Sequence, residues 1–265
     1  MIEARGLEVR AGGRALLEDV SLAVATGELV AVVGPNGAGK STLRKALCGD
    51  VGVARGEVRM CGRALEDWPP VERARVRAVM QQDSSLTFPF TSLEVALMGR
   101  LPHLRGAEGV RDYEIARAAL DAVEARHLEE RLYPTLSGGE RQRVHLARVL
   151  AQIWEHSEGR ERYLLLDEPT SNLDLAHQHS TLAVARRFSR EGVGVLVILH
   201  DLNLAAQYAD RVIMMGGGRV VASGSPSEVL TREAILETFA LPVIVTEHPQ
   251  LGCPLVVPVS TSAVK

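Results

Sequence analysis

The chain is poor in cysteine and in aromatic side chains, and it has no long hydrophobic run. Its 265 residues include three cysteines, which lie far apart and form no CxxC pair, so the sequence indicates neither a zinc site nor a disulfide framework. Reducing cytoplasm is the expected environment. The longest apolar stretches, such as Val193 to Leu199, are much shorter than the roughly 20 residues that span a bilayer. The acidic N-terminal segment has no signal-peptide layout, so contact with a membrane is expected to go through a partner.

The charge balance gives no support for a nucleic-acid partner. The formal net charge is −3, so no electrostatic attraction to nucleic acid is expected for the chain as a whole. A chain of this length can bury a sizeable core, and it fits one large domain or one domain with a subdomain.

Apolar strand patterns alternate with helical patterns in both outer parts of the sequence. Such alternation predicts an α/β fold with a mainly parallel sheet and helices on both faces. Residues 84–162 have the periodicity of helices instead, which indicates a helical insertion into the α/β core. The predicted strands are 7–10, 16–24, 28–33, 163–167, 193–199 and 211–215, and the predicted helices include 113–124, 138–151, 173–190 and 202–209.

A complete phosphate-loop pattern follows the third predicted strand. Its glycines allow the backbone N–H groups to turn inward, where they and the next helix N-terminus can bind phosphates. Lys40 is expected to neutralise the β and γ oxygens, and Ser41 to place its hydroxyl on Mg²⁺. Thr42 is expected near the α-phosphate. The predicted nucleotide-binding residues here are Gly34, Pro35, Asn36, Gly37, Ala38, Gly39, Lys40, Ser41 and Thr42.

Two carboxylates end a later apolar strand. Asp167 follows three leucines, so it is expected at the carboxyl end of a buried strand, where α/β sheets bind ligands. Asp167 is predicted to hold Mg²⁺ through water. Glu168 follows directly, and the presence of a phosphate loop elsewhere in the chain favours a role in chemistry over that of a helix cap.

A second anion-binding segment is predicted at residues 136–140, Leu-Ser-Gly-Gly-Glu. Ser137 and Glu140 form a capping box, so the N–H groups of Gly138 and Gly139 are expected at an open helix start. With the phosphate loop and the two carboxylates, this segment resembles the signature of the ATP-binding cassette ATPases. The resemblance extends from about Ile2 to Phe239.

The resemblance implies a P-loop, RecA-like core with a mainly parallel sheet, an N-terminal antiparallel β subdomain and an inserted helical subdomain. Residues 1–265 then form a single ABC ATPase domain that binds ATP and Mg²⁺. Its expected parts are the nucleotide-binding core at 1–83 and 163–240, the helical subdomain with the signature at 84–162, and a C-terminal tail at 241–265.

The resemblance also implies catalytic roles for three residues. Glu168 matches the general base that polarises the attacking water, and His200 matches the histidine that hydrogen-bonds the γ-phosphate. Gln82 matches the glutamine that senses Mg²⁺ and the γ-phosphate, with Gln81 as the alternative. The implied metal-binding residues are Ser41, Gln82 and Asp167.

Two copies of the chain are expected to share their ATP sites. By resemblance, the copies pack head to tail, and each closes its signature over ATP that is held by the other. The residues implied in this contact are Ser137, Gly138, Gly139, Glu140 and, from the segment 171–174, Asp174.

One feature of the resembling family is missing. An aromatic residue usually stacks on adenine about two dozen residues before the phosphate loop, a place that falls near Ala11. No aromatic residue occurs before Trp68. Arg10 or Arg14 could stack a guanidinium plane on the base instead.

A narrower resemblance points to the importers of iron-siderophores, cobalamin and haem. It rests on Phe-Pro-Phe at 88–90 and on Met-Gly-Arg-Leu-Pro-His at 98–103. Within that group, the histidines of 174–179, the long connection 154–162 and the Pro-rich tail 248–255 look most like the haem-importer ATPases.

Four residues of these segments allow more than one interpretation. His177 and His179 are two apart on a predicted helix and point to different faces, so they are poor joint ligands for haem or a metal. Phe88 and Phe90 are either core residues or contacts for a permease helix.

The sequence thus predicts an ATPase subunit that energises haem import through a separate permease. The expected partners are a second copy, a dimeric transmembrane permease and, indirectly, a periplasmic haem-binding protein. The expected location is peripheral, on the cytoplasmic face of the inner membrane. The alternatives are an iron-siderophore or cobalamin importer, and a soluble ABC ATPase that acts on nucleic acid.

Overall fold

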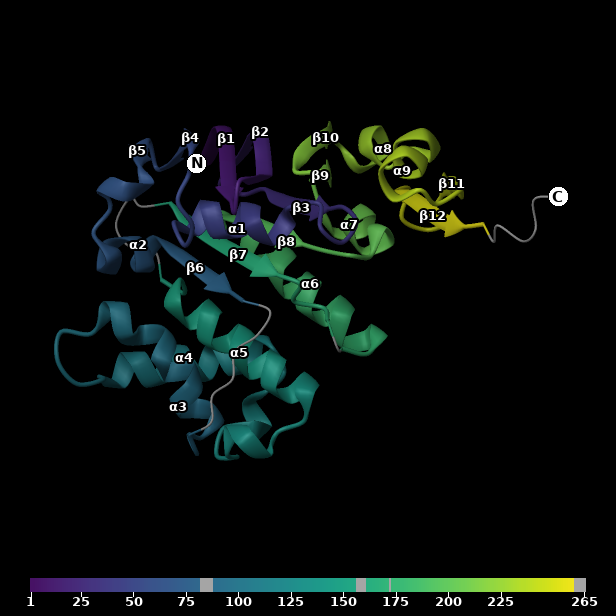
Figure 1. Cartoon of the computed structure of the whole chain (residues 1–265). Helices are drawn as coiled ribbons and strands as arrows, with labels where there is room; N and C mark the ends of the chain where they lie inside the picture. The colour runs from purple at the N-terminus through teal and green to yellow at the C-terminus, as the bar shows by residue number, and fades with distance from the viewer. Residues whose placement is uncertain (82–87, 156–160, 172, 260–265) are drawn as a thin grey trace. The chain divides into compact units, whose positions relative to one another are not determined.

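The computed structural model describes residues 1–81, 88–155, 161–171 and 173–259 (Figure 1). The chain forms two compact units, and one of the two boundaries between them falls within strand β8. The first unit comprises Met1–Asp67 and Leu196–Lys265, and the second comprises Trp68–Val195. Within the described ranges, no helix is both long enough and apolar enough to cross a membrane.

The N-terminal part of the first unit is an antiparallel sheet with the strand order β2-β1-β4-β5. In β1, the apolar residues Ile2, Ala4, Leu7 and Val9 are buried and most of the residues between them are more exposed, as expected for a sheet with one face on the core. The bounds are β1 Ile2–Ala11, β2 Arg14–Val24, β4 Arg55–Met60 and β5 Arg63–Ala64.

A second sheet in the first unit has the order β10-β9-β3-β8. Strand β3 runs parallel to β9, and all five of its residues are buried, as in sheets that are covered on both faces. The bounds are β3 Leu29–Val33, β8 Val193–Ile198, β9 Arg211–Gly216 and β10 Arg219–Gly224.

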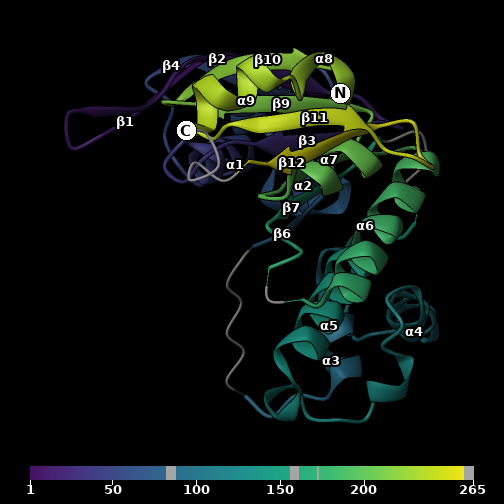
Figure 2. The ribbon, with the colours of Figure 1, turned by 90° about the vertical axis from the view of Figure 1, so that its right-hand side faces the viewer.

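The described part of the first unit also contains four α-helices and a C-terminal hairpin. The hairpin joins β11 and β12 as an antiparallel pair, drawn in yellow in Figure 2. The bounds are α1 Lys40–Cys48, α7 Leu202–Tyr208, α8 Pro226–Val229, α9 Arg232–Phe239, β11 Val243–Glu247 and β12 Pro254–Pro258.

The second unit combines parallel strands with a group of helices. Strands β6 and β7 are parallel, and Met80 of β6 pairs with Leu166 of β7. Backbone approaches backbone where Gly99 meets α5, because a Cβ on Gly99 would lie 2.0 Å from the carbonyl oxygen of Arg148. The bounds are α2 Pro70–Val76, β6 Arg77–Met80, α3 Ser92–Leu97, α4 Val110–Ala122, α5 Gly138–Gln152, β7 Arg162–Asp167 and α6 Leu175–Arg190, with a 3-10 segment η2 at Met98–His103.

This architecture confirms the predicted α/β fold, with its parallel-rich core sheet and its N-terminal antiparallel sheet. From residue 88 to 155, the regular elements are all helical, as the periodicity indicates. The proposed boundaries of the nucleotide-binding core, the helical subdomain and the tail stay predictions.

Candidate functional site

The phosphate loop connects β3 to α1 in a conformation that depends on glycine. Gly39 has a φ of 98°, and a Cβ there would lie 2.9 Å from Cδ2 of Leu17. At Gly34, a Cβ would lie 2.3 Å from the carbonyl oxygen of Met215. Neighbouring strands therefore press directly against the loop backbone, and no larger residue fits at either position.

Lys40, the first residue of α1, lies largely buried against the loop that precedes it. Its Nζ donates to the carbonyl oxygens of Gly34, at 2.7 Å, and Pro35, at 3.1 Å. The first turn of α1 holds no acidic side chain, so the positive end of the helix is not offset by a carboxylate from its own first turn. An ammonium group, a helix N-terminus and a glycine loop together form a cradle for an anion.

His200 lies at the end of the strand next to the one that leads into this loop. The N–H of Leu199 donates to the carbonyl oxygen of Val32 at 3.0 Å, so β8 and β3 end side by side. The histidine is exposed, and the next residue, Asp201, caps helix α7. The first unit therefore brings the phosphate loop and His200 to the same edge of its sheet.

In the second unit, Asp167 and Glu168 occupy the end of β7 as predicted. Asp167 is 4% exposed and is the last residue of the strand. Glu168 has a φ of 50°, which costs of order 1 kcal/mol for a residue with a side chain. Ser171 stabilises this turn, because both its N–H and its hydroxyl donate to the carbonyl oxygen of Glu168, at 3.1 and 2.9 Å.

The two glutamines of the predicted sensor position are only partly described. Gln81 is exposed and directly follows Met80, so the parallel register places it across from Asp167. Gln82, the preferred candidate, lies outside the described residues, as does Asn172 of the segment 171–174. The choice between Gln81 and Gln82 stays open.

The signature segment begins helix α5 with the predicted capping box. The N–H of Glu140 donates to Oγ of Ser137 at 3.3 Å, and the N–H of Ser137 donates to Oε2 of Glu140 at 2.8 Å. The hydrogen bonds from Ser137 hold the pKa of Glu140 below its usual range, and the nearby Arg131, at 3.0 Å, lowers it further. The carboxylate is thus committed to the cap, and Gly138 and Gly139 form the open first turn.

Asp174 caps α6 and also contacts a histidine. Its Oδ1 accepts from the N–H of His177 at 2.9 Å and lies 2.7 Å from Nδ1 of the same residue. The hydrogen bond from the His177 N–H, followed by the ring contact, lowers the pKa of Asp174. His177 is therefore engaged by its own helix cap, which favours the interpretation that it is not a haem or metal ligand.

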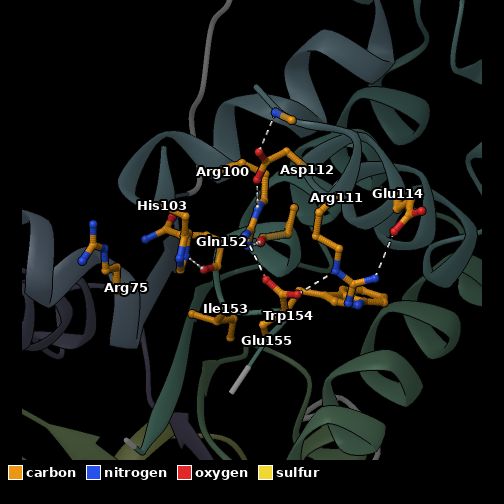
Figure 3. A network of polar contacts seen from close by, with 12 residues as sticks. Arg75, Arg100, His103, Arg111, Asp112, Glu114, Gln152, Ile153, Trp154 and Glu155 are labelled. Carbon is orange, nitrogen blue, oxygen red and sulfur yellow. Dashed lines mark hydrogen bonds and ion pairs between the residues drawn. The ribbon is translucent and has the colours of Figure 1, made fainter. Parts of the chain in front are cut away.

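The far end of the signature helix is fixed by a polar network (Figure 3). Arg100 of η2 is 3% exposed and binds Asp112 at 3.0 Å, the carbonyl oxygen of Ala151 at 2.9 Å and Glu155 at 3.1 Å. The carbonyl oxygen of Gln152 lies 2.7 Å from Nε2 of His103. From the sequence, the segment 98–103 has no assigned functional role. In the structure, this segment anchors α5 at the end opposite Ser137.

Two further contacts could not be read from the sequence. Nε2 of Gln142 in α5 donates to the carbonyl oxygen of Pro169 and so joins the signature helix to the turn after Glu168. Ser171 stabilises the same turn. No sequence pattern singles out Gln142 or Ser171, since each donates to a backbone carbonyl oxygen rather than to a ligand.

The residues with predicted metal roles are oxygen donors, which suits Mg²⁺. Magnesium is commonly bound through one or two carboxylates and substrate phosphates, with several waters retained. Ser41 offers an exposed hydroxyl at the start of α1, and Asp167 offers a buried carboxylate. The described residues contain no group of three or more His, Cys, Asp or Glu side chains that could hold a metal ion by themselves.

Phe88, Arg10 and Arg14, whose roles the sequence leaves open, are all exposed. Phe88 is 69% exposed and its ring centroid lies 6.2 Å from that of Phe90, so at least Phe88 is not part of the core. Arg10 and Arg14 are both exposed near the tip of the β1–β2 hairpin. A stacking role for either arginine stays a prediction.

Comparison with known families shows to which ATPases the chain is similar. The family described as "ABC transporter" matches residues 17–171, which include the phosphate loop, the signature and both carboxylates. The chain belongs to the ABC transporter family. His200 lies beyond the matched range, so its assignment depends on the position at the end of β8.

Several curated relatives of this ABC protein carry one name. This chain is 59% identical over 264 residues to the hemin import ATP-binding protein HmuV of Gloeobacter violaceus, with 100% of this chain and 96% of the relative covered. The protein of that name from Myxococcus xanthus is 53% identical, covering 97% of this chain and 96% of the relative. That from Pseudomonas aeruginosa is 52% identical, covering 97% and 99%.

Solved ABC transporter structures share the fold. A metal-chelate type ABC transporter in an inward-facing conformation matches with a TM-score of 0.82 at 25% identity, covering 99% of this chain and 98% of the other. A bacterial ABC transporter cassette, solved as a dimer, matches with a TM-score of 0.74 at 26% identity, covering 85% and 99%. The ABC fold therefore extends over nearly the whole of this chain.

Proposed function

We propose that this ABC protein is the ATP-hydrolysing subunit of a haem importer and that it works as a head-to-tail dimer on a separate transmembrane permease. The assignment to haem rests on one observation. Relatives that cover nearly the whole chain at 47–59% identity are named hemin import ATP-binding proteins. The metal-chelate type transporter among the solved structures supports the same substrate class.

In the proposed mechanism, the phosphate loop binds the triphosphate and orients it. The N–H groups of the loop and Lys40 hold the β and γ phosphates, and Ser41, Asp167 and Gln82, with Gln81 as the alternative, would hold Mg²⁺. Magnesium, when bound, offsets the negative charge that develops on the phosphates. Glu168 accepts a proton from the attacking water, and His200 donates a hydrogen bond to the γ-phosphate.

The signature contributes the second half of each site from the partner copy. In this proposal, Gly138 and Gly139 offer their N–H groups, and Ser137 its hydroxyl, to the γ-phosphate of ATP that is bound by the other copy. The capping box supports this role because Glu140 already accepts from Ser137 and does not cover the two glycines. Asp174 lies at the exposed start of α6 and is proposed to contact the partner.

Coupling to the permease is proposed to use the exposed apolar side chains near the start of the helical group. Phe88 is 69% exposed, and Leu132, next to Thr91 in an isolated bridge, is 41% exposed. Exposed apolar residues that gather at one place are typical of a protein contact. The protein is then peripheral, on the cytoplasmic face of the membrane that holds the permease.

Reconstitution tests this function and its substrate. The subunit is to be combined with the permease of a haem importer in vesicles, with ATP inside and haem, cobalamin or a ferric siderophore outside together with the matching binding protein. We expect ATP-dependent uptake of haem and not of the other two. Uptake of cobalamin or siderophore alone would reassign the substrate, whereas ATP hydrolysis without uptake of any of them would contradict an import role.

A further inference from the structure

The C-terminal hairpin has an outer edge that offers almost no backbone donor. The N–H of Val259 donates to the carbonyl oxygen of Pro242, and the N–H of His248 donates to that of Cys253. These two residue pairs, and every second pair between them, are therefore the hydrogen-bonded pairs of the ladder. The alternation of an antiparallel ladder then turns the backbone groups of residues 254, 256 and 258 outward. Pro254 and Pro258 have no N–H. Within β12, all of which is described, Val256 is thus the single outward N–H donor.

Asn203 closes this edge with both ends of its side-chain amide. The N–H of Val256 donates to Oδ1 of Asn203 at 2.7 Å, and Nδ2 of Asn203 donates to the carbonyl oxygen of Val256 at 3.1 Å. The side chains of Val243 and Val256 are buried and lie on the same face of the hairpin. The amide therefore substitutes for the missing neighbour strand, and it fixes the hairpin in register on helix α7.

Asn203 is also tied to the start of α7. Its N–H donates to Oδ1 of Asp201 at 2.7 Å, and that same oxygen caps the N–H of Leu204 at 3.1 Å. Asp201 directly follows His200. One residue thus joins the hairpin to the helix cap that begins next to the histidine at the end of β8.

We propose that Asn203 is a positioning residue and that the hairpin holds His200 in its working place through it. The seven-residue helix α7 is too short to keep its first turn rigid alone, so an external anchor on that turn fixes the segment 199–203. The hairpin supplies the anchor. This inference rests on the proposed function in that His200 is taken to act on the γ-phosphate.

The test compares three variants of the full chain. Asn203→Ala removes the amide, and Val256→Pro removes the N–H at an edge position, with prolines already present two residues away in each direction. Val257→Thr, on the exposed face of the same hairpin, is the matched control. Steady-state ATP hydrolysis gives kcat and KM, and amide hydrogen exchange is followed for residues 199–204 and, as reference, for α1.

We expect both variants to lower kcat about three- to tenfold, as the loss of about one hydrogen bond of positioning predicts, with KM for ATP within about twofold of wild type. Hydrogen exchange should accelerate in 199–204 and not in α1, and the double variant should be no slower in turnover than the worse single one. Val257→Thr should match wild type in every readout.

The two proposals fail in different ways. If the wild-type protein hydrolyses no ATP, the proposed function fails. The exchange data still show whether the hydrogen bonds between Asn203 and Val256 hold residues 199–203 in place. If the wild type is active and both variants keep its kcat and its exchange pattern, the positioning role of Asn203 is overturned. Equal acceleration of exchange in α1 would also overturn it, since the effect would then be general destabilisation.

Discussion

At the scale of single residues, Glu168 combines a reactive side chain with an uncommon backbone conformation. Positive φ values outside glycine are found repeatedly at functional sites, where the surrounding structure maintains them. Here the surrounding structure is Ser171, which bonds the Glu168 carbonyl twice. The turn is therefore held in place independently of the carboxylate, so an amide can replace that group without disturbing the backbone.

We expect Glu168→Gln to bind ATP with unchanged affinity and to hydrolyse it about 10²- to 10⁴-fold more slowly, because the phosphate loop is intact and the proton acceptor is lost. Isothermal titration and single-turnover hydrolysis measure the two quantities. Glu233→Gln, at an exposed position in α9, is the control and should behave as wild type. Wild-type turnover in Glu168→Gln would exclude Glu168 as the general base.

His145 is a buried polar residue within the signature helix. It is 3% exposed, and neither ring nitrogen has a hydrogen-bond partner among the residues that the structure describes. Burial, with a smaller contribution from Arg148, lowers the pKa of His145 to about 3. The unfolded chain binds a proton near pH 6.5, so between pH 6.5 and 3 the unfolded state holds more protons and stability falls as the pH falls.

We therefore expect His145→Leu to be more stable than wild type, with the difference growing by about 2 kcal/mol between pH 7 and pH 5. Urea unfolding at the two pH values measures the free energies. Val149→Ala on the same helix removes apolar contacts without a titrating group, so its effect should be equal at both pH values. A His145→Leu difference that does not change with pH would show that the histidine is not buried in its neutral form.

At the scale of elements, most of the regular structure could be predicted because its pattern is local. The run of three leucines before Asp167 predicts β7, and Ser137 with Glu140 predicts the start of α5, within one residue of the observed bounds. Helix α6 was expected from Leu173 but begins at Leu175, since Asp174 uses its carboxylate as the N-cap. The contact between Asn203 and Val256 was not predicted, because it joins a side-chain amide to backbone atoms 53 residues away. The pattern of side chains cannot reveal such contacts.

The network at the end of α5 allows a prediction of stability. Replacing Arg100 with Met should cost about 3–5 kcal/mol of unfolding free energy, because Asp112 and the Ala151 carbonyl would lose a buried partner. Arg111 binds Glu155 too, but its side chain is 64% exposed, so Arg111→Gln should cause little measurable change. Chemical unfolding of both variants gives the comparison. Equal effects would show that the burial of Arg100 is not what makes it important.

Phe88 and Phe90 give a prediction that separates docking from packing. Replacing both with serine should leave folding and basal ATP hydrolysis largely intact and reduce transport in vesicles, because the apolar contact offered by the exposed Phe88 and its neighbour is lost. Burial of both rings would instead make the change cost several kcal/mol of stability. Thermal unfolding and haem uptake are to be measured on the same preparations, and a large drop in melting temperature without a selective transport defect would exclude docking.

At the scale of the whole molecule, one copy of the chain holds both a phosphate loop and a signature, which in the proposed dimer serve different ATP molecules. A similar bacterial cassette is dimeric in its solved structure. Two copies in head-to-tail contact have two composite sites, each with the loop of one copy and the signature of the other. When the loop and the signature are both substituted, ATP hydrolysis therefore depends on whether the two substitutions are in one copy or divided between the copies.

A linked heterodimer tests this arrangement. One copy carries Lys40→Ala and Ser137→Arg, and the other is wild type. In the head-to-tail dimer, each site then pairs one damaged half with one intact half, so we expect almost no ATP hydrolysis. If each chain instead used its own loop and signature, the wild-type copy would keep a complete site and about half of the activity would remain.

The reference is a linked dimer with the two substitutions divided between the copies, Lys40→Ala in one and Ser137→Arg in the other. In the head-to-tail dimer, this reference confines the damage to one composite site and leaves the second intact. Hydrolysis by the reference but not by the first heterodimer is the expected result, and the reverse order of the two activities would show that loop and signature act within one chain.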